Sequence, residues 1–156
     1  MANVRIVVAT LLLASGMVSA EEKSWALRTA DLVVVGKLEL SSYYLSLDGI
    51  HISGNIVSTE TLYGPAESGV RLRYSNLIPC SLWSSISHSI KCDYRSVWYS
   101  WSSEKERLTQ QGIWLLWRGP AASWKGRGWD TGFRPLDYRD YTLSIISKRK
   151  ELETRH

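Results

Sequence analysis

Apolar and polar residues alternate with a period of two along several short segments of the chain, which is typical of β-strands. Residues 32–35 form a continuous apolar run rich in β-branched side chains. Leu38 and Leu40 continue this run in alternation with Lys37 and Glu39. The pattern predicts a strand that is buried on both faces or that closes a barrel.

The clearest local signal is a β-hairpin centred on Asp48-Gly49. Apolar residues alternate with polar ones on both sides of this dipeptide. An Asp-Gly pair in that setting predicts a two-residue type I′ turn between two strands. We expect the returning strand to run as far as Gly64, with a bulge or kink at Gly54.

Two later segments also have strand patterns. The segment VRLRY turns Val70, Leu72 and Tyr74 to one side and two arginines to the other. The segment IWLLWR, residues 113–118, is apolar up to Arg118 and predicts another strand. We expect residues 129–133 to pair back on it after a turn.

Helical patterns lie near both ends of the chain and before the last apolar strand. Residues 24–29 and 103–112 suit short helices, the second ending at Gly112. A longer helix is expected from Asp137, which would serve as its N-cap. Four apolar side chains of that helix fall near one face and are expected to be its buried side: Tyr138, Tyr141, Ile145 and Leu152.

These elements together predict a mostly β fold with flanking helices. About five short strands follow one another without the alternating helices that a parallel sheet needs. A small antiparallel barrel, closed or nearly closed, accommodates such strands. It would carry a short N-terminal helix and a C-terminal helix.

The first twenty residues have the layout of a secretory signal peptide. Arg5 precedes an apolar run, and small residues at 18–20 offer a cleavage site. The run is shorter than the roughly 20 residues that a membrane span needs, although an uncleaved anchor is the alternative. We therefore expect residues 1–20 to be removed and residues 21–156 to form one secreted or periplasmic domain, with no stable membrane insertion.

The charge of the chain argues against a nucleic-acid partner. The formal net charge is +4, and it falls to +3 when residues 1–20, which contain one arginine and no acid, are removed. A small positive charge suits solubility and a modest attraction to anionic surfaces, but it is not the strong basic patch of a nucleic-acid-binding protein.

Cys80 and Cys92 are the only cysteines. In an oxidising compartment, two cysteines with eleven residues between them predict one disulfide that closes a local loop. The alternative, a pair of metal thiolates, has only His88 nearby. We expect the disulfide, and no metal.

The sequence contains none of the catalytic motifs that would predict an enzyme or a cofactor. Ser102 and Lys105 form an S-x-x-K pattern, but they lie at the start of a charged helix, where Ser102 suits a cap. His51 lies between two isoleucines of the predicted hairpin, where a solvated or hydrogen-bonded strand histidine is the simplest interpretation.

Tryptophan is unusually frequent, with eight residues against one phenylalanine. Trp25, Trp114 and Trp117 fall in elements that need core or near-core side chains. The remaining candidates lie in SWKGRGW, in which Trp124 and Trp129 flank Lys125 and Arg127. These two tryptophans could cover the open end of a hairpin, or they could form a platform that grips a sugar, an anion or an aromatic group.

Four segments give the chain a resemblance to exported netrin-like domains. ADLVVVGKL, IVSTETLYG, VRLRY and GIWLLWR resemble the successive strands of these domains, over roughly residues 24–118. The resemblance implies the OB-type barrel of the tissue inhibitors of metalloproteinases. Those inhibitors present an N-terminal cysteine to the zinc of the enzyme, whereas this chain has no cysteine before Cys80. Only the barrel and its extracytoplasmic setting therefore carry over.

The expected function is that of an exported, non-enzymatic domain that binds an extracytoplasmic protein or glycan. Its candidate ligand-binding residues are Trp124, Lys125, Arg127 and Trp129. The alternative is a small carbohydrate- or envelope-binding module that uses exposed tryptophans. A secreted hydrolase is the less favoured third hypothesis.

Overall fold

The computed structural model describes residues 25–46, 48–65, 68–79, 105–127 and 131–155. A 3-10 turn, η1 (Leu136–Tyr138), leads into the helix α4 (Arg139–Glu153). Shorter helices occupy residues 25–29 and 105–108. The strands are β1 (Leu32–Leu45), β2 (Gly49–Tyr63), β3 (Arg71–Pro79), β4 (Gln111–Arg118), β5 (Trp124–Lys125) and β6 (Phe133–Arg134). The predicted mostly β fold with flanking helices is confirmed.

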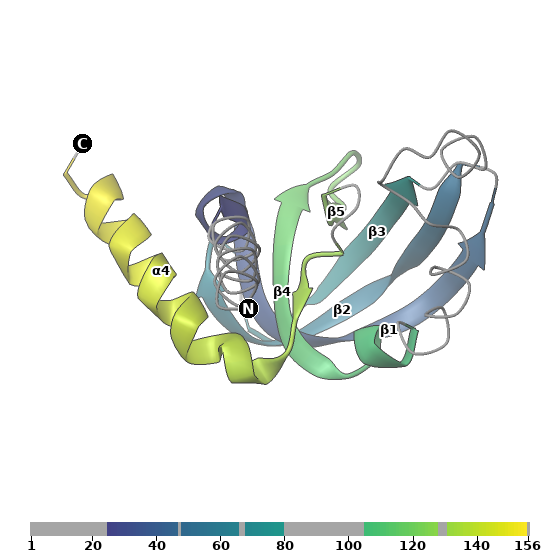
Figure 1. Cartoon of the computed structure of the whole chain (residues 1–156), viewed down its shortest axis with the longest axis horizontal. Helices are drawn as coiled ribbons and strands as arrows, with labels where there is room; N and C mark the ends of the chain where they lie inside the picture. The colour runs from purple at the N-terminus through teal and green to yellow at the C-terminus, as the bar shows by residue number, and fades with distance from the viewer. Residues whose placement is uncertain (1–24, 47, 66–67, 80–104, 128–130, 156) are drawn as a thin grey trace, which may run out of the picture.

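Five of the strands close into a barrel (Figure 1). They follow the order β1-β2-β3-β5-β4, and β4 pairs again with β1. β3 and β5 are parallel and meet at Tyr74 and Trp124, whereas the other pairings are antiparallel. β1 pairs with β2 along one edge and, over Leu32–Lys37, with β4 along the other, which closes the barrel. The predicted small OB-like barrel is confirmed.

The two continuous apolar runs are explained by burial on both faces of the barrel wall. Leu32 and Val34 of β1 point into the barrel, while Val33 and Val35 point outward under the helices. The inner cluster comprises Leu32, Val34, Leu38, Ile50, Ile52, Ile56, Leu72, Tyr74, Leu108, Trp114, Leu116 and Phe133. The outer cluster comprises Ala26, Leu27, Ala30, Val33, Val35, Leu62, Ile113, Leu115, Trp117 and Ile146.

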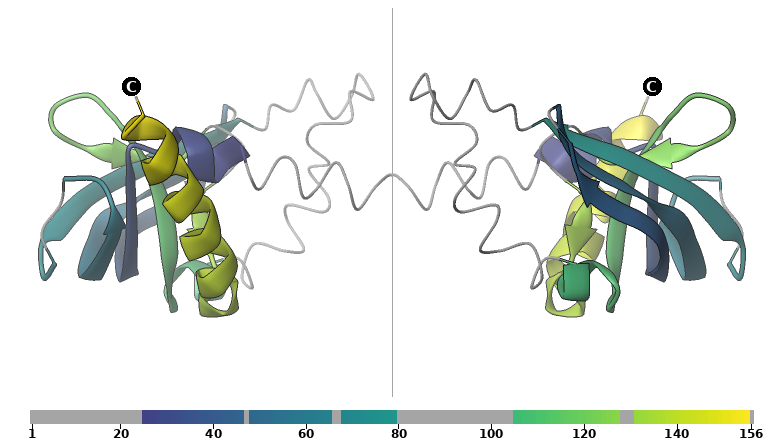
Figure 2. Two further views of the ribbon diagram at one scale, coloured as in Figure 1. Left: turned by 90° about the vertical axis from the view of Figure 1, so that its left-hand side faces the viewer. Right: turned by 90° about the vertical axis from the view of Figure 1, so that its right-hand side faces the viewer.

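The α4 helix packs beside the helix of residues 25–29, as the side views show (Figure 2). Arg149 joins the two helices, since its Nη1 donates to the carbonyl oxygen of Ala30 at 2.7 Å. This contact sets the rotation of α4, so that Thr142 and Ile146 are its buried residues. The predicted buried face was therefore wrong in part, because Tyr141 and Leu152 are exposed.

Three local predictions need correction. Leu45 pairs with Ile50, and the amide of Ser46 donates to the carbonyl of Gly49, so the hairpin turn precedes Gly49 and is not centred on Asp48-Gly49. Val70 is exposed because it precedes β3. Asp137 does not cap α4, since it lies within η1 and the N-cap position belongs to Tyr138.

Gly112 also has a different role from the predicted one. The short helix ends at residue 108, and Gly112 already belongs to β4. A Cβ atom at this position would lie 2.3 Å from the ring of Phe133 in β6. Gly112 is therefore needed for the approach of β6, which pairs back on β4 at Trp114 and Phe133 as predicted.

Candidate functional site

A groove of about 1030 Å³ crosses the outer surface of the barrel, from β1 to the helix of residues 25–29. We call it the outer groove. The described residues of its lining are Trp25, Asp31, Ser42, Tyr44, His51, Ile52, Ser53, Ser75, Asn76, Leu77, Trp117, Arg118, Lys125, Gly126 and Arg127. Its volume is at the upper end of the range for small-ligand sites, roughly 300–1,000 Å³.

Three neighbouring strands supply the first part of the groove as two rows of side chains. Ser42, Ser53 and Ser75 stand in register across β1, β2 and β3 and form the serine row. The hydroxyl groups of Ser42 and Ser53 are hydrogen-bonded at 2.8 Å. These residues alternate with those of the inner cluster, so their side chains lie on the outer face of the sheet. The row offers hydroxyl donors and acceptors to a ligand.

The second row consists of Tyr44, His51 and Leu77, which are also in register. The rings of Tyr44 and His51 stack, with 4.7 Å between their centres and 5° between their planes. Tyr44 is 50% exposed and Leu77 is 38% exposed. One end of the groove therefore presents a flat aromatic face to solvent.

The imidazole of His51 is held in place by the hairpin turn. Its Nε2 atom lies 2.9 Å from the Ser46 hydroxyl and 3.0 Å from the Asp48 carboxylate. Ser46 also donates to Asp48. These hydrogen bonds from Ser46 and His51 lower the pKa of Asp48 from 3.8 to about 2. The result is the hydrogen-bonded strand histidine that the sequence predicts.

This serine, histidine and aspartate do not have the geometry of a hydrolytic triad. A triad needs one ring nitrogen for the nucleophile and the other for the carboxylate. Here Ser46 and Asp48 both contact Nε2. The cluster therefore orients the imidazole against Tyr44 and relays no proton through the ring.

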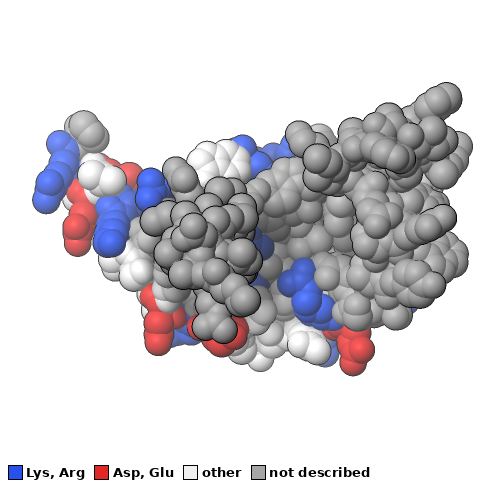
Figure 3. All heavy atoms as spheres, in the orientation of Figure 1, with Lys and Arg blue, Asp and Glu red and all other residues white. Residues whose placement is uncertain are grey.

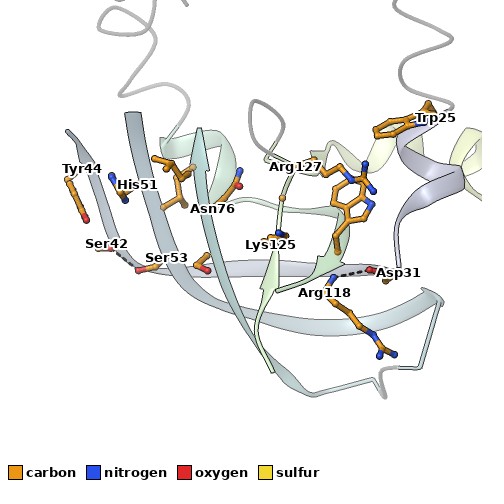
Figure 4. A pocket seen from close by; sticks show the side chains of 15 residues that line it. Trp25, Asp31, Ser42, Tyr44, His51, Ser53, Asn76, Arg118, Lys125 and Arg127 are labelled. Carbon is orange, nitrogen blue, oxygen red and sulfur yellow. Dashed lines mark hydrogen bonds between the residues drawn. The ribbon is translucent and has the colours of Figure 1, made fainter. Parts of the chain in front are cut away.

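The other end of the groove carries cations and indole rings. The guanidinium carbon of Arg127 lies 4.7 Å from the centre of the Trp25 ring and 5.1 Å from that of Trp117. Lys125 is exposed beside it. Neither cation forms an ion pair with a carboxylate of the described residues. Figure 4 shows Lys125 between this end and the Tyr44–His51 end.

Asp31 places an exposed carboxylate at this end of the groove. Its Oδ2 atom accepts a hydrogen bond from the backbone amide of Arg118 at 2.9 Å. The side chain of Arg118 is directed away from the other labelled groups (Figure 4). Lys125 and Arg127 are therefore the two cations of the groove that face a ligand.

The structure brings together two of the four ligand-binding residues predicted from SWKGRGW. Lys125 and Arg127 line the outer groove. Trp124 lies in β5, and its partly buried ring packs against the inner cluster. Trp129 lies outside the described residues, as do Cys80 and Cys92, so the predicted platform and disulfide stay predictions.

Sequence patterns missed the aromatic residues of the site. Trp114 and Trp117 are buried as expected, whereas Trp25, which was expected in or near the core, is 45% exposed. Tyr44 and His51 occupy outward positions of a strand pair, which is the signal that could have found them. Nothing in the sequence indicates that Trp25 and Arg127 meet.

Comparison with known protein families, with curated protein sequences and with solved structures finds no match for this chain. Within the described ranges, no three histidine, cysteine, aspartate or glutamate residues are grouped so that they could hold a metal ion. None of the described helices is long and apolar enough to cross a membrane.

Proposed function

We propose that this chain is an exported, non-enzymatic binding domain, and that its partner or ligand lies in the outer groove. The observation that carries the proposal is the position of Arg127. Two indole rings hold its guanidinium group at the groove, and it forms no ion pair with a carboxylate of the described residues. A guanidinium that stacks on aromatic faces keeps its N–H edge free for an external acceptor.

The remaining lining of the groove supports the same proposal. Exposed aromatic rings, serine hydroxyls and a second cation converge on one concave surface. Sites of this composition bind ligands through a few oriented polar groups and through apolar contact. The signal-like N-terminus and the resemblance to netrin-like domains support an extracytoplasmic setting, in which the partner is a protein or a glycan.

A second candidate function is a carbohydrate- or envelope-binding module. Trp25 supports it, because this half-exposed indole stands at the rim of a groove that also contains a half-exposed tyrosine. Sugar rings stack their apolar faces on such side chains. The two candidates differ in the chemistry of the partner and share the groove.

Charges of both signs gather over α4 (Figure 3). Two of its cations have partners, since Arg149 pairs with Glu153 and Arg139 pairs with Glu60. The outer groove differs from this surface because its cations stand beside exposed aromatic rings in one hollow.

A capture experiment tests the proposal. The exported protein is exposed to arrays of purified extracytoplasmic proteins and envelope glycans, beside the charge-reversed variant Lys125→Glu/Arg127→Glu. The matched control is Lys37→Glu/Lys105→Glu, which changes the same charge at exposed positions outside the groove. Folding of each variant is checked by circular dichroism.

We expect a partner that the parent and the control retain and that the groove variant loses. A partner that all three proteins retain would place binding elsewhere. If the parent protein retains no component of the arrays, the proposed binding function is wrong.

A further inference from the structure

The outer groove also indicates what kind of ligand it accepts. We infer that it binds an acidic glycan, with an anionic sugar substituent at Arg127, Lys125 and Trp117 and sugar rings extending over the serine row to Tyr44. This inference rests on the proposed function and specifies its ligand. Three separate features of the groove carry it.

The first feature is a buried donor without an acceptor. Trp117 lines the groove and is 4% exposed, and its indole nitrogen has no hydrogen-bond acceptor within the described part of the chain. Buried polar groups almost always have a partner, and one left unsatisfied destabilises the fold. This nitrogen has almost no accessible surface, so an oxygen atom of a ligand would satisfy the N–H after a shift of the side chains that cover it.

The second feature is the pair of cations beside that indole. Arg127 stacks on the Trp117 ring itself, so its N–H groups are close to the same location. Lys125 is exposed on the neighbouring strand β5. A guanidinium fork with an ammonium group nearby favours a carboxylate, sulfate or phosphate group over a neutral oxygen.

The third feature is the path from the cations to the aromatic face. The serine row supplies hydroxyl groups suited to a hydroxyl-rich ligand, and Ser42 and Ser53 already hydrogen-bond to one another. Tyr44 and Trp25 are half exposed at opposite ends of the groove (Figure 4). Stacking faces at both ends with hydroxyls between them suit a chain of sugar rings better than a peptide, whose apolar side chains would need pockets.

Binding of defined oligosaccharides tests the inference. The probes are a galacturonic acid hexamer, the same hexamer with all carboxylates methyl-esterified, a heparin hexasaccharide and a hexaglutamate peptide. Affinity is measured by titration calorimetry at two salt concentrations, because charge pairing at the surface weakens with ionic strength. We expect one or both acidic glycans to bind. The esterified hexamer is expected to bind roughly ten- to a hundredfold more weakly than the acid, because esterification removes the carboxylate that would contact Arg127 and Lys125.

Variants locate the contacts. Arg127→Gln is expected to weaken binding of the acidic glycan by roughly ten- to a hundredfold. Trp117→Phe keeps an aromatic ring but removes the N–H together with part of the buried indole, so its free energy of unfolding is measured beside its affinity. It should weaken binding of the acidic glycan. Tyr44→Ala should weaken it by roughly three- to tenfold through lost stacking. Lys37→Gln, outside the groove, should leave the affinity unchanged.

Several outcomes would overturn the inference. The anion site would be wrong if the acid hexamer and its ester bound with equal affinity. It would also be wrong if Arg127→Gln bound the acidic glycan as tightly as the Lys37→Gln control. Tighter binding of hexaglutamate than of either glycan would make the ligand an acidic peptide. A third outcome is that no glycan binds, while the protein array yields a partner that the Lys125→Glu/Arg127→Glu variant does not retain. The inference of an acidic glycan would then be wrong, and the proposed binding function would stand.

Discussion

The guanidinium group of Arg127 lies over the indole ring of Trp25, with 4.7 Å between the guanidinium carbon and the ring centre. Trp25 belongs to the helix before β1, and Arg127 follows β5. Their contact therefore ties the N-terminal helix to the rim of the outer groove. Arg127 is expected to contribute both to stability and to binding, so the effects of replacing it on the free energy of unfolding and on affinity are measured separately.

Replacement of Arg127 by glutamine should lower the free energy of unfolding by about 1 kcal/mol, since two partly exposed cation–π contacts are lost. Urea denaturation followed by tryptophan fluorescence measures the change. Lys125→Gln is the matched control. Lys125 has no ring contact within the described part of the chain, so this variant should change stability by less than about 0.5 kcal/mol. Equal losses in the two variants would mean that the stacking does not stabilise the fold.

Among the charged residues of α4, Arg149 should contribute most to the free energy of unfolding. It donates to the carbonyl oxygen of Ala30 at 2.7 Å and lies 3.9 Å from the centre of the Tyr63 ring. The carbonyl groups at the end of a helix need such donors. Arg149→Met keeps the apolar stem and removes the donors, and should cost about 2–3 kcal/mol of unfolding free energy.

The neighbouring Lys148 provides the comparison for Arg149. It is exposed, and Lys148→Met should change the free energy of unfolding by less than about 0.5 kcal/mol. Chemical denaturation of both variants gives the two values. A loss in the Lys148 variant as large as that in the Arg149 variant would show that α4 is sensitive to charge and not to this hydrogen bond.

Asp48 should make the fold more sensitive to acid. Hydrogen bonds from Ser46 and His51 lower its pKa to about 2, so the folded state resists protonation of this carboxylate. A lowered carboxyl pKa contributes stability above the unfolded-state value of about 3.9, and this contribution disappears as the pH falls through 2. Asp48→Asn should therefore flatten the dependence of stability on pH between about 4 and 2.

Denaturation at a series of pH values gives that dependence, and NMR titration of the Asp48 carboxyl group gives its pKa directly. The control is Asp137→Asn, which changes an exposed carboxylate away from the hairpin. An Asp48 pKa near the ordinary value would remove the basis of this prediction.

The turn between β4 and β5 should be open to stabilisation. Ala121 and Ala122 have φ angles of 51° and 56°, in the left-handed region that disfavours residues with a Cβ atom. The turn is held by hydrogen bonds from Gly119 to Ser123 and from Ser123 to Pro120. Ala122→Gly should raise the free energy of unfolding by about 1 kcal/mol. Ala26→Gly, in the first helix, should lower the free energy of unfolding. If both variants lowered it, the turn would not be strained.

The barrel itself follows closely from the sequence. The continuous apolar run at residues 32–35 predicts a strand that is buried on both faces or that closes a barrel, and the apolar residues 113–117 predict another strand. Both strands lie between the inner and outer clusters. Alternation in residues 71–74 correctly predicts an inward Leu72 and Tyr74. Period-two patterns are reliable here because burial of one face fixes the register of a strand.

Contacts between distant segments decided what the local patterns could not. Gly112 suits the end of a helix by local rules, but the ring of Phe133 needs its missing Cβ. The stripe of Tyr141 and Leu152 suits a buried helix face, but Arg149 binds Ala30 and turns another face inward. Each outcome depends on a partner far away in the chain.

The candidate site divides in the same way. Composition and the SWKGRGW segment singled out Lys125 and Arg127 as ligand-binding residues, and both line the outer groove. The two rows of side chains that complete the groove arise from the register of β1, β2 and β3. The Trp25 ring that contacts Arg127 comes from a helix before the barrel. The sequence alone determined which residues favour strands and which could bind. Only the tertiary structure decided which of them meet, because strand register and helix docking are set by packing between segments distant in the sequence.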